Sequence, residues 1–189
     1  DNKLNLISEY NKINLVPFGE FLPFENFFKK LGLKKISYGY ESFSAGNDRQ
    51  LISLNDKNFN FIPLICYEII YSGKVNLKSD KTNFIINISE DGWFGDSIGP
   101  HQHFSHTIFR AIEEGKNIIR STNNGISAYI DSNGIVISKL ESTKKGVIEI
   151  NKYKKFNETL FSKFGNKIFF YILLFYIIVI FFLKKWEIK

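Results

Sequence analysis

Cysteine is nearly absent from this 189-residue sequence, which contains one, Cys66. A lone cysteine has no partner within its chain, so an intramolecular disulfide is excluded, and Cys66 is either a small buried apolar residue or a functional thiol. Internal repeats and low-complexity linkers are also missing, which favours one globular domain with an appendage.

The start of the chain lacks the basic segment, apolar segment and small-residue cleavage site of a signal peptide. The alternating residues Leu4–Ile7 are typical of the end of a hairpin whose partner is not in the sequence. We therefore expect a fragment of a longer protein, for which the missing signal says nothing about targeting.

The net charge is +6 and the isoelectric point about 9.2. From position 167 onward there are four lysines and one glutamate, so this tail carries +3 and the preceding residues the other +3. The lysines before the tail stand mostly singly or in pairs, without a stripe of stacking aromatics between them. This pattern is typical of a solvated surface, and no nucleic-acid partner is expected.

The apolar run Phe61–Ile65 leads directly to Cys66 and is followed by Tyr67 and Glu68. An isolated cysteine at the end of such a strand is more often buried and inert than reactive. Here, however, polar residues follow Cys66 directly, so we expect the chain to leave the core at this cysteine. The pattern predicts a strand that delivers a nucleophile.

A second candidate element lies upstream, where Lys12 and Glu20 stand eight residues apart. Pro17 and Gly19 between them favour a fixed, non-helical turn. A lone lysine is usually a solvated surface residue. Because a carboxylate and a rigid turn lie beside Lys12, a role in a functional site is the second interpretation of this lysine.

Periodicity and turn residues predict alternating strands and helices. Apolar spacings of three and four predict helices over 24–33 and 100–114, and a hairpin is expected over 51–54 and 59–66, turned at 55–58. A polar loop over 37–50 precedes this hairpin and is either a lid or a passive surface loop. Further strands are expected over 83–89, 118–119, 126–130, 135–140 and 147–150, the last closing the sheet.

The C-terminal residues 168–183 are sixteen consecutive uncharged residues, bounded by Lys167 and Lys184. As a helix they cover about 24 Å, somewhat less than the roughly 30 Å of a bilayer core. Snorkelling of both lysines, with Phe164 and Trp186 at the interfaces, makes up the difference. A buried core helix is the alternative, but a stretch without a polar face predicts a transmembrane helix.

Other residues leave their roles open. His101, His103 and His106 lie near Asp96, but no cysteine or glutamate completes a known zinc spacing, so no metal is expected. Trp93 and Phe94 are candidates for a substrate pocket or for core packing. Arg120, Asn123 and Asn124 are suited either to holding a loop or to meeting a lipid headgroup.

Four motifs occur in a fixed order: YNKINLVPFGEFLP from Tyr10, ICYEI around Cys66, NISEDGWFGDSIGP with QHF from Asn87, and RSTNNGI from Arg120. Together they resemble the apolipoprotein N-acyltransferase family, the membrane branch of the nitrilase superfamily. The resemblance implies an α/β fold, the C-terminal part of a nitrilase-like αββα sandwich followed by one transmembrane helix. We expect a catalytic domain over 1–153, incomplete at its N-terminal side, a juxtamembrane connection over 154–167, a span over 168–183 and a basic tail over 184–189.

The same resemblance implies a Glu-Lys-Cys triad, in which Cys66 and Lys12 are the catalytic cysteine and lysine. Glu20 matches a second glutamate that positions the lysine, and Tyr67 and Glu68 match supporting residues beside the nucleophile. The general-base glutamate has no counterpart in this sequence, because Glu9 is too close to Lys12. No cofactor or metal is implied.

The implied reaction is N-acylation of the diacylglyceryl-cysteine N-terminus of a bacterial apolipoprotein, with a phospholipid as acyl donor and a thioester intermediate. The implied enzyme is a monomer in the bacterial inner membrane, with its globular domain facing the periplasm. Two alternatives stay open: a superfamily amidase that acts on small C–N substrates, and an inactive membrane-anchored fragment without the triad glutamate.

Overall fold

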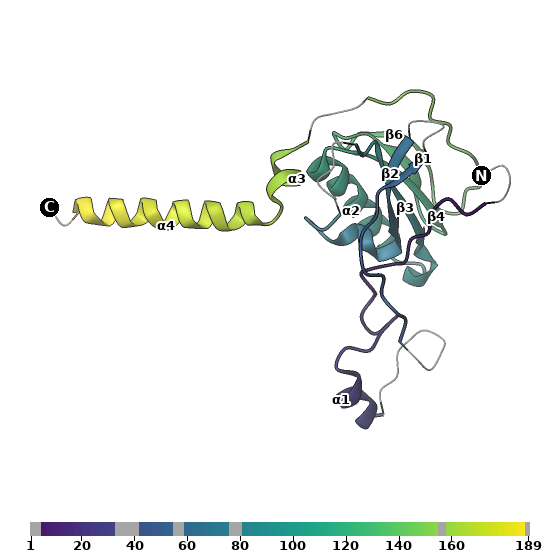
Figure 1. The fold of residues 1–189 in the computed structure, drawn as a ribbon, viewed down its shortest axis with the longest axis horizontal. Coiled ribbons are helices and arrows are strands. Elements are labelled where there is room, and N and C mark those ends of the chain that lie inside the picture. The colour runs from purple at the N-terminus through teal and green to yellow at the C-terminus, as the bar shows by residue number, and fades with distance from the viewer. Residues whose placement is uncertain (1–4, 33–41, 55–58, 76–80, 155–157, 188–189) are drawn as a thin grey trace.

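The computed structural model describes residues 5–32, 42–54, 59–75, 81–154 and 158–187. Its centre is a six-stranded sheet in the order β1-β2-β3-β4-β5-β6 (Figure 1). The strands are β1 (Ile52–Leu54), β2 (Phe59–Ile65), β3 (Phe84–Glu90), β4 (Asn117–Asn123), β5 (Ser127–Ile130) and β6 (Val136–Leu140). The three central strands β2, β3 and β4 run parallel, and the outer pairs are antiparallel. This mixed sheet with its helices confirms the predicted α/β class.

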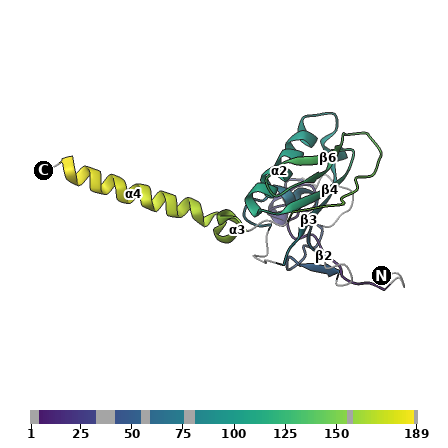
Figure 2. The same cartoon turned by 90° about the horizontal axis from the view of Figure 1, so that it is seen from above.

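The core lies on one face of the sheet. Alternate residues of a strand point to the same face, and the register places Ile62, Ile85, Ile118 and Ile130 side by side on β2 to β5. All four are fully buried. Helix α2 (Gly99–Glu114) covers this face, and its apolar residues pack against the isoleucines (Figure 2).

The bounds of α2 follow from its end residues. Pro100 occupies the first turn, where its missing N–H costs no helical hydrogen bond. Gly115 ends the helix with a φ of 61°, a left-handed conformation that glycine adopts without steric penalty. The helix predicted over 100–114 is therefore confirmed to within one residue.

The opposite face of the sheet is only partly covered. Phe84 is buried against Tyr153, with ring centroids 4.7 Å apart, whereas Ile88 further along the same strand is 54% exposed. Within the described residues this is the single β layer of the fold.

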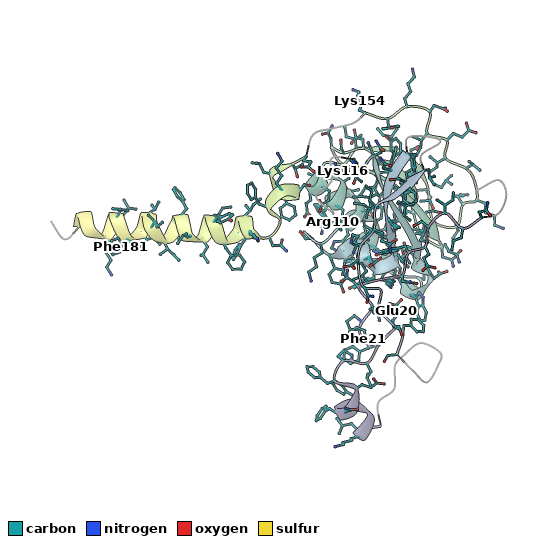
Figure 3. The ribbon with its side chains drawn as sticks, in the orientation of Figure 1. Glu20, Phe21, Arg110, Lys116, Lys154 and Phe181 are labelled. Atoms are coloured by element: carbon teal, nitrogen blue, oxygen red, sulfur yellow. The ribbon has the colours of Figure 1, made fainter. Side chains whose placement is uncertain are left out.

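Two segments extend away from the sheet (Figure 1). One carries the short helix α1 (Glu25–Lys30), with Glu20 and Phe21 where it leaves the body (Figure 3). The other follows α3 (Leu160–Phe164) and consists of the 21-residue helix α4 (Lys167–Glu187). The apolar window Lys167–Lys184 of α4 is not buried, and α4 is long and apolar enough to cross a membrane. At about 1.5 Å per residue, α4 matches the roughly 30 Å of a bilayer core.

Two predicted elements need correction. The strand expected over 147–150 does not form, and Val147 is 84% exposed. Alternating residues there suit a strand, but residues 147–150 pair with none of the six strands of the sheet. The helix expected over 24–33 begins later, at Glu25, because Phe24 has a φ of 50°. Residue 33, the turn at 55–58 and residues 37–41 of the polar loop lie outside the described residues, as does the side chain of Trp186.

Candidate active site

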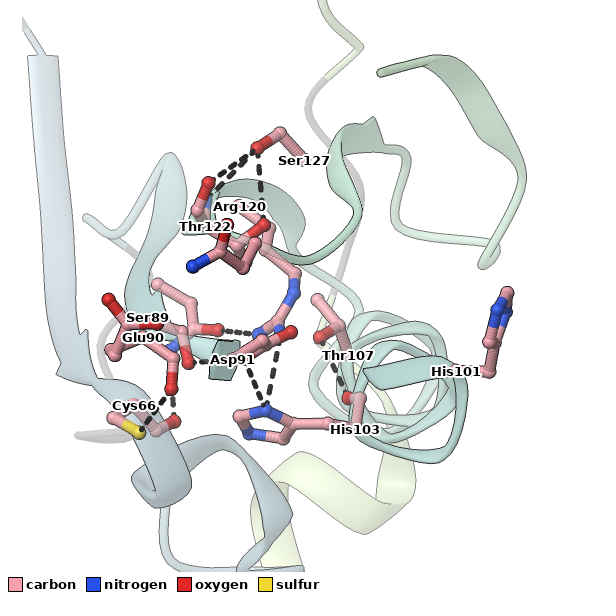
Figure 4. Close-up of polar contacts among 12 residues, drawn as sticks. Cys66, Ser89, Glu90, Asp91, His101, His103, Thr107, Arg120, Thr122 and Ser127 are labelled. Carbon is pink, nitrogen blue, oxygen red and sulfur yellow. Dashed lines mark hydrogen bonds and ion pairs between the residues drawn. The ribbon is translucent and has the colours of Figure 1, made fainter. Parts of the chain in front are cut away.

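Cys66 lies at a sharp junction where β2 ends and the 3-10 helix η2 (Cys66–Ile70) begins. Its φ is 52°, in a region that residues with side chains rarely occupy. Such strain persists only where the surrounding structure holds it, and it clusters at functional sites. The sulfur is half-buried and lies 4.0 Å from the backbone oxygen of Glu90, at the end of the neighbouring strand β3 (Figure 4).

Lys12 and Glu20 form an ion pair. Lys12 Nζ lies 2.7 Å from one carboxylate oxygen of Glu20, and the other oxygen accepts a hydrogen bond from the Val16 N–H at 2.9 Å. Both side chains are mostly buried, at 10% and 23% exposure. Glu20 is therefore held by the turn that it follows, and it fixes the position of the ammonium group.

Glu68 connects the Lys12 segment to the Cys66 junction. Its carboxylate is fully buried and accepts hydrogen bonds from both segments: Tyr10 Oη at 2.9 Å, and the N–H groups of Ile13 at 3.0 Å, Asn14 at 3.2 Å and Ile65 at 2.8 Å. Arg49 lies 3.5 Å away as its charge partner. Because these donors flank Lys12 and Cys66, the carboxylate ties the Lys12 segment to the Cys66 junction.

Tyr10 is part of this cluster and titrates abnormally. Its hydroxyl donates to Glu68 and accepts from Arg49 at 3.0 Å. Burial raises the pKa of Tyr10 above its usual value of 10; the Arg49 charge opposes this rise and Glu68 adds to it. The phenol therefore stays protonated and available as a donor at neutral pH.

A second buried cluster centres on Asp91, directly after β3. Asp91 Oδ2 lies 2.8 Å from Arg120 Nη2, and Oδ1 lies 2.9 Å from His103 Nδ1 and accepts from Ser89 Oγ at 2.7 Å (Figure 4). Burial alone raises the pKa of Asp91, but the hydrogen bond from His103 and the Arg120 charge outweigh it and lower the pKa below its usual value. The carboxylate is therefore ionised at neutral pH.

Asn87 joins this cluster to Cys66. Its amide nitrogen donates to the backbone oxygens of Leu64 and Cys66, each at 3.2 Å, and its amide oxygen accepts from Arg120. Asn87 and Arg120 are buried at 0% and 2% exposure. The carbonyl of Cys66 is thus fixed by a polar network inside the core.

The aromatic candidates divide between two environments. Phe94 lies against the His103 ring with centroids 5.4 Å apart, and the Tyr67 ring lies near the same His103 ring with centroids 6.1 Å apart. Trp93 is 66% exposed. Phe94 and Tyr67 therefore pack on the Asp91 cluster, whereas Trp93 has a free face beside the site.

The three histidines lie in different surroundings. His103 is buried against Asp91, whereas His101 is exposed and points away from that cluster (Figure 4). Burial lowers the pKa of His106, and the Arg110 charge lowers it further. In the part of the chain that the structure describes, no three potential metal ligands converge.

The family model for carbon-nitrogen hydrolases matches residues 1–151, which include both clusters. The chain belongs to the carbon-nitrogen hydrolase family. Curated relatives extend this match: a protein of Brucella melitensis named apolipoprotein N-acyltransferase is 39% identical over 149 residues, covering 79% of this chain and 28% of the relative. One of the same name from Wigglesworthia glossinidia brevipalpis is 42% identical over 190 residues, covering 97% of this chain and 36% of the relative.

This carbon-nitrogen hydrolase chain thus spans about a third of the length of those curated relatives. Among solved structures, the NitN amidase of a Nesterenkonia species matches with a TM-score of 0.48 and 13% identity. That match covers 72% of this chain and 48% of the amidase chain.

Sequence reasoning overlooked several residues of this carbon-nitrogen hydrolase site. Asn87 carried a usable signal, because it is the one polar residue inside the apolar run Phe84–Ile88. Asp91 also carried a signal, because it is a carboxylate that follows the same strand directly. Arg49 gave no signal, since it lies in a loop and only the fold brings it to Glu68.

Proposed function

We propose that this chain carries the nucleophile of an enzyme that N-acylates the diacylglyceryl-cysteine N-terminus of bacterial apolipoproteins, with a phospholipid as acyl donor. The observation that carries the proposal is the likeness to relatives named apolipoprotein N-acyltransferase, which extends over most of the chain. The strained Cys66 junction and the Lys12–Glu20 pair support it, because they supply a nucleophile and a fixed cation.

In the first step, Cys66 Sγ attacks the ester carbonyl of the phospholipid. A bond forms between sulfur and the acyl carbon, the thiol proton passes to a general base, and the carbonyl oxygen becomes an oxyanion. Lys12 Nζ and the Tyr67 N–H stabilise that charge. The C–O bond then breaks, the leaving oxygen takes the proton from the base, and a lysophospholipid departs from the thioester.

In the second step, the free amine of the acceptor attacks the thioester carbon. A C–N bond forms, the C–S bond breaks, and the thiol of Cys66 regains a proton that the amine gave up. Two easier steps thereby replace one difficult transfer. No residue of this chain matches the family's general-base glutamate, so we assign that role to sequence that the longer relatives have and this chain does not span.

The membrane forms part of the proposal because both acyl donor and acceptor are lipids. We propose that α4 spans the bacterial inner membrane, that the globular domain faces the periplasm and that the enzyme works as a monomer. The exposed apolar surface of α4 supports the span. Phe181, which is 66% exposed, is one of the residues on this surface (Figure 3). A site close to the bilayer also shelters the thioester from water and favours attack by the amine.

The family membership keeps one alternative activity open, hydrolysis of small C–N substrates such as amides. An amidase of that kind needs no exposed apolar helix such as α4. An inert membrane-anchored chain is the other alternative, since the base is not in this sequence. The acyl adduct described in the next paragraph distinguishes acyl transfer from both alternatives.

Intact-mass measurement after incubation with phospholipid vesicles tests the proposal. It should be made on this chain and on any longer product of the same gene. We expect a hydroxylamine-sensitive acyl adduct that disappears in Cys66→Ala and Lys12→Ala. Lys139→Ala is the matched control, because Lys139 pairs with Glu141 on the exposed surface. If neither this chain nor the longer product acquires an adduct, and both are folded and inserted in the membrane, the acyl-transfer proposal is wrong.

A further inference from the structure

The buried Asn87–Arg120 pair sets the orientation of the peptide that joins Cys66 to Tyr67. The amide nitrogen of Asn87 donates to the Cys66 carbonyl oxygen at 3.2 Å, from within the core between the sheet and α2. A trans peptide is planar, and its C=O and N–H point in opposite directions. When Asn87 holds the carbonyl toward the core, the Tyr67 N–H is directed away from it.

The direction of that N–H matters to the proposed chemistry. A hydrogen-bond donor stabilises an oxyanion only if it is aimed beforehand at the position where the charge develops. The peptide could otherwise rotate, because Cys66 has a φ of 52° and begins the short helix η2. Rotation would exchange the N–H for a carbonyl oxygen, which repels an oxyanion.

Asn87 is itself held in one orientation by the Asp91 cluster. Its amide oxygen accepts from Arg120 Nη1, which leaves the amide nitrogen facing the two backbone oxygens. Arg120 is in turn held by Asp91, at 2.8 Å and 3.1 Å. A flipped amide would place a donor against the guanidinium, so the charge pair selects the correct orientation.

From these contacts we infer that Asn87 and Arg120 are positioning residues, which hold the Cys66–Tyr67 peptide so that the Tyr67 N–H serves as the oxyanion donor. The inference rests on the proposed function and deepens it. Neither residue touches the substrate; both act through the backbone of Cys66. It explains why the apolar run Phe84–Ile88 of β3 carries a fully buried asparagine beside the nucleophile.

Infrared spectroscopy of an acylated Cys66 tests the inference. The chain in detergent micelles is acylated with a p-nitrophenyl ester labelled with carbon-13 at its carbonyl, and the Cys66→Ala spectrum is subtracted. In the wild type, a hydrogen bond from the Tyr67 N–H lowers the carbonyl stretching frequency below that of a free thioester. In Asn87→Leu, the band moves up toward the free value, and acylation slows about 10- to 100-fold.

Asn117→Leu is the matched control. Asn117 is also a buried asparagine of this sheet, but it bonds to Tyr129 and to the Lys154 backbone, not to Cys66. It should lower stability and leave the carbonyl band and the acylation rate as in the wild type. Arg120→Lys keeps the charge beside Asp91 but loses the fork that bonds Asn87 through Nη1 and Asp91 through Nη2, so a smaller upward band shift is expected. This variant decides the question if Asn87→Leu does not fold.

Unchanged band positions in both Asn87→Leu and Arg120→Lys would overturn the inference, as would a folded wild-type chain whose Cys66 takes no acyl group from the activated ester. Equal shifts in the Asn117→Leu control would also overturn it, since general loosening would then explain the effect. If the ester experiment succeeds but phospholipid vesicles give no adduct, the positioning role stands and the phospholipid donor is wrong.

Discussion

Replacing Glu68 should separate the lysine segment from the nucleophile and destabilise the whole site. The carboxylate is fully buried and accepts four hydrogen bonds from Tyr10, Ile13, Asn14 and Ile65. Its charge partner Arg49 has a side chain only 8% exposed. Hydrogen bonds to a charged group contribute about 1.5–3 kcal/mol each, and removal of one partner from a buried ion pair costs about 3–5 kcal/mol.

For Glu68→Ala we therefore expect a loss of about 3–5 kcal/mol in the free energy of unfolding. Glu68→Gln keeps one acceptor oxygen but turns an NH₂ group toward other donors, and its loss should be about 2–3 kcal/mol. Urea unfolding in mild detergent measures both values. Hydrogen exchange of the Ile13 and Asn14 amides reports the same change locally, because both lose their acceptor.

Glu141→Gln is the control for this experiment. Glu141 pairs with Lys139, and both side chains are about half exposed. Glu141→Gln should therefore lower the free energy of unfolding by no more than about 1 kcal/mol. The reasoning is refuted if Glu68→Gln unfolds as the wild type does, or if the amides of residues 13 and 14 exchange no faster in it. In either case another contact would hold the lysine segment.

Three further predictions concern pH and the membrane helix. Because the pKa of Tyr10 is raised in the folded state, the contribution of Tyr10 to the free energy of unfolding is complete below the unfolded pKa of about 10 and is lost as pH rises above it. The difference in unfolding free energy between wild type and Tyr10→Phe should therefore shrink from pH 9 to 12. The folded pKa of Asp91 is lowered, so its stabilisation is complete above the unfolded pKa of about 3.9 and is lost as pH falls toward the folded value. The difference in unfolding free energy between wild type and Asp91→Asn should accordingly decrease below about pH 4, and a pH-independent difference would contradict the argument. Ile177→Lys places a charge in the middle of α4, so co-sedimentation of the chain with vesicles should weaken, whereas Lys144→Ala in an exposed turn should leave it unchanged.

Local patterns predicted most of the regular structure, because periodicity and end residues act within a few positions of the chain. Helix α2 followed from its apolar spacing, Pro100 and Gly115, and α4 from a long uncharged run. The strand expected over 147–150 does not form, because a strand exists only where its backbone pairs with another strand, and alternation does not reveal that pairing.

The candidate site also has parts that local sequence predicts and parts that depend on the tertiary structure. By itself, the sequence determined the candidate residues for the chemistry: the lone thiol after an apolar strand, and a lysine with a carboxylate eight residues away. Only the tertiary structure decided that Glu68 and Arg49 join these segments, and that Asn87, Asp91 and Arg120 form one buried network behind Cys66. The residues in these contacts lie up to 58 positions apart in the sequence. The partner of a buried charge cannot be read from the sequence, because the packing of several strands brings the two groups together.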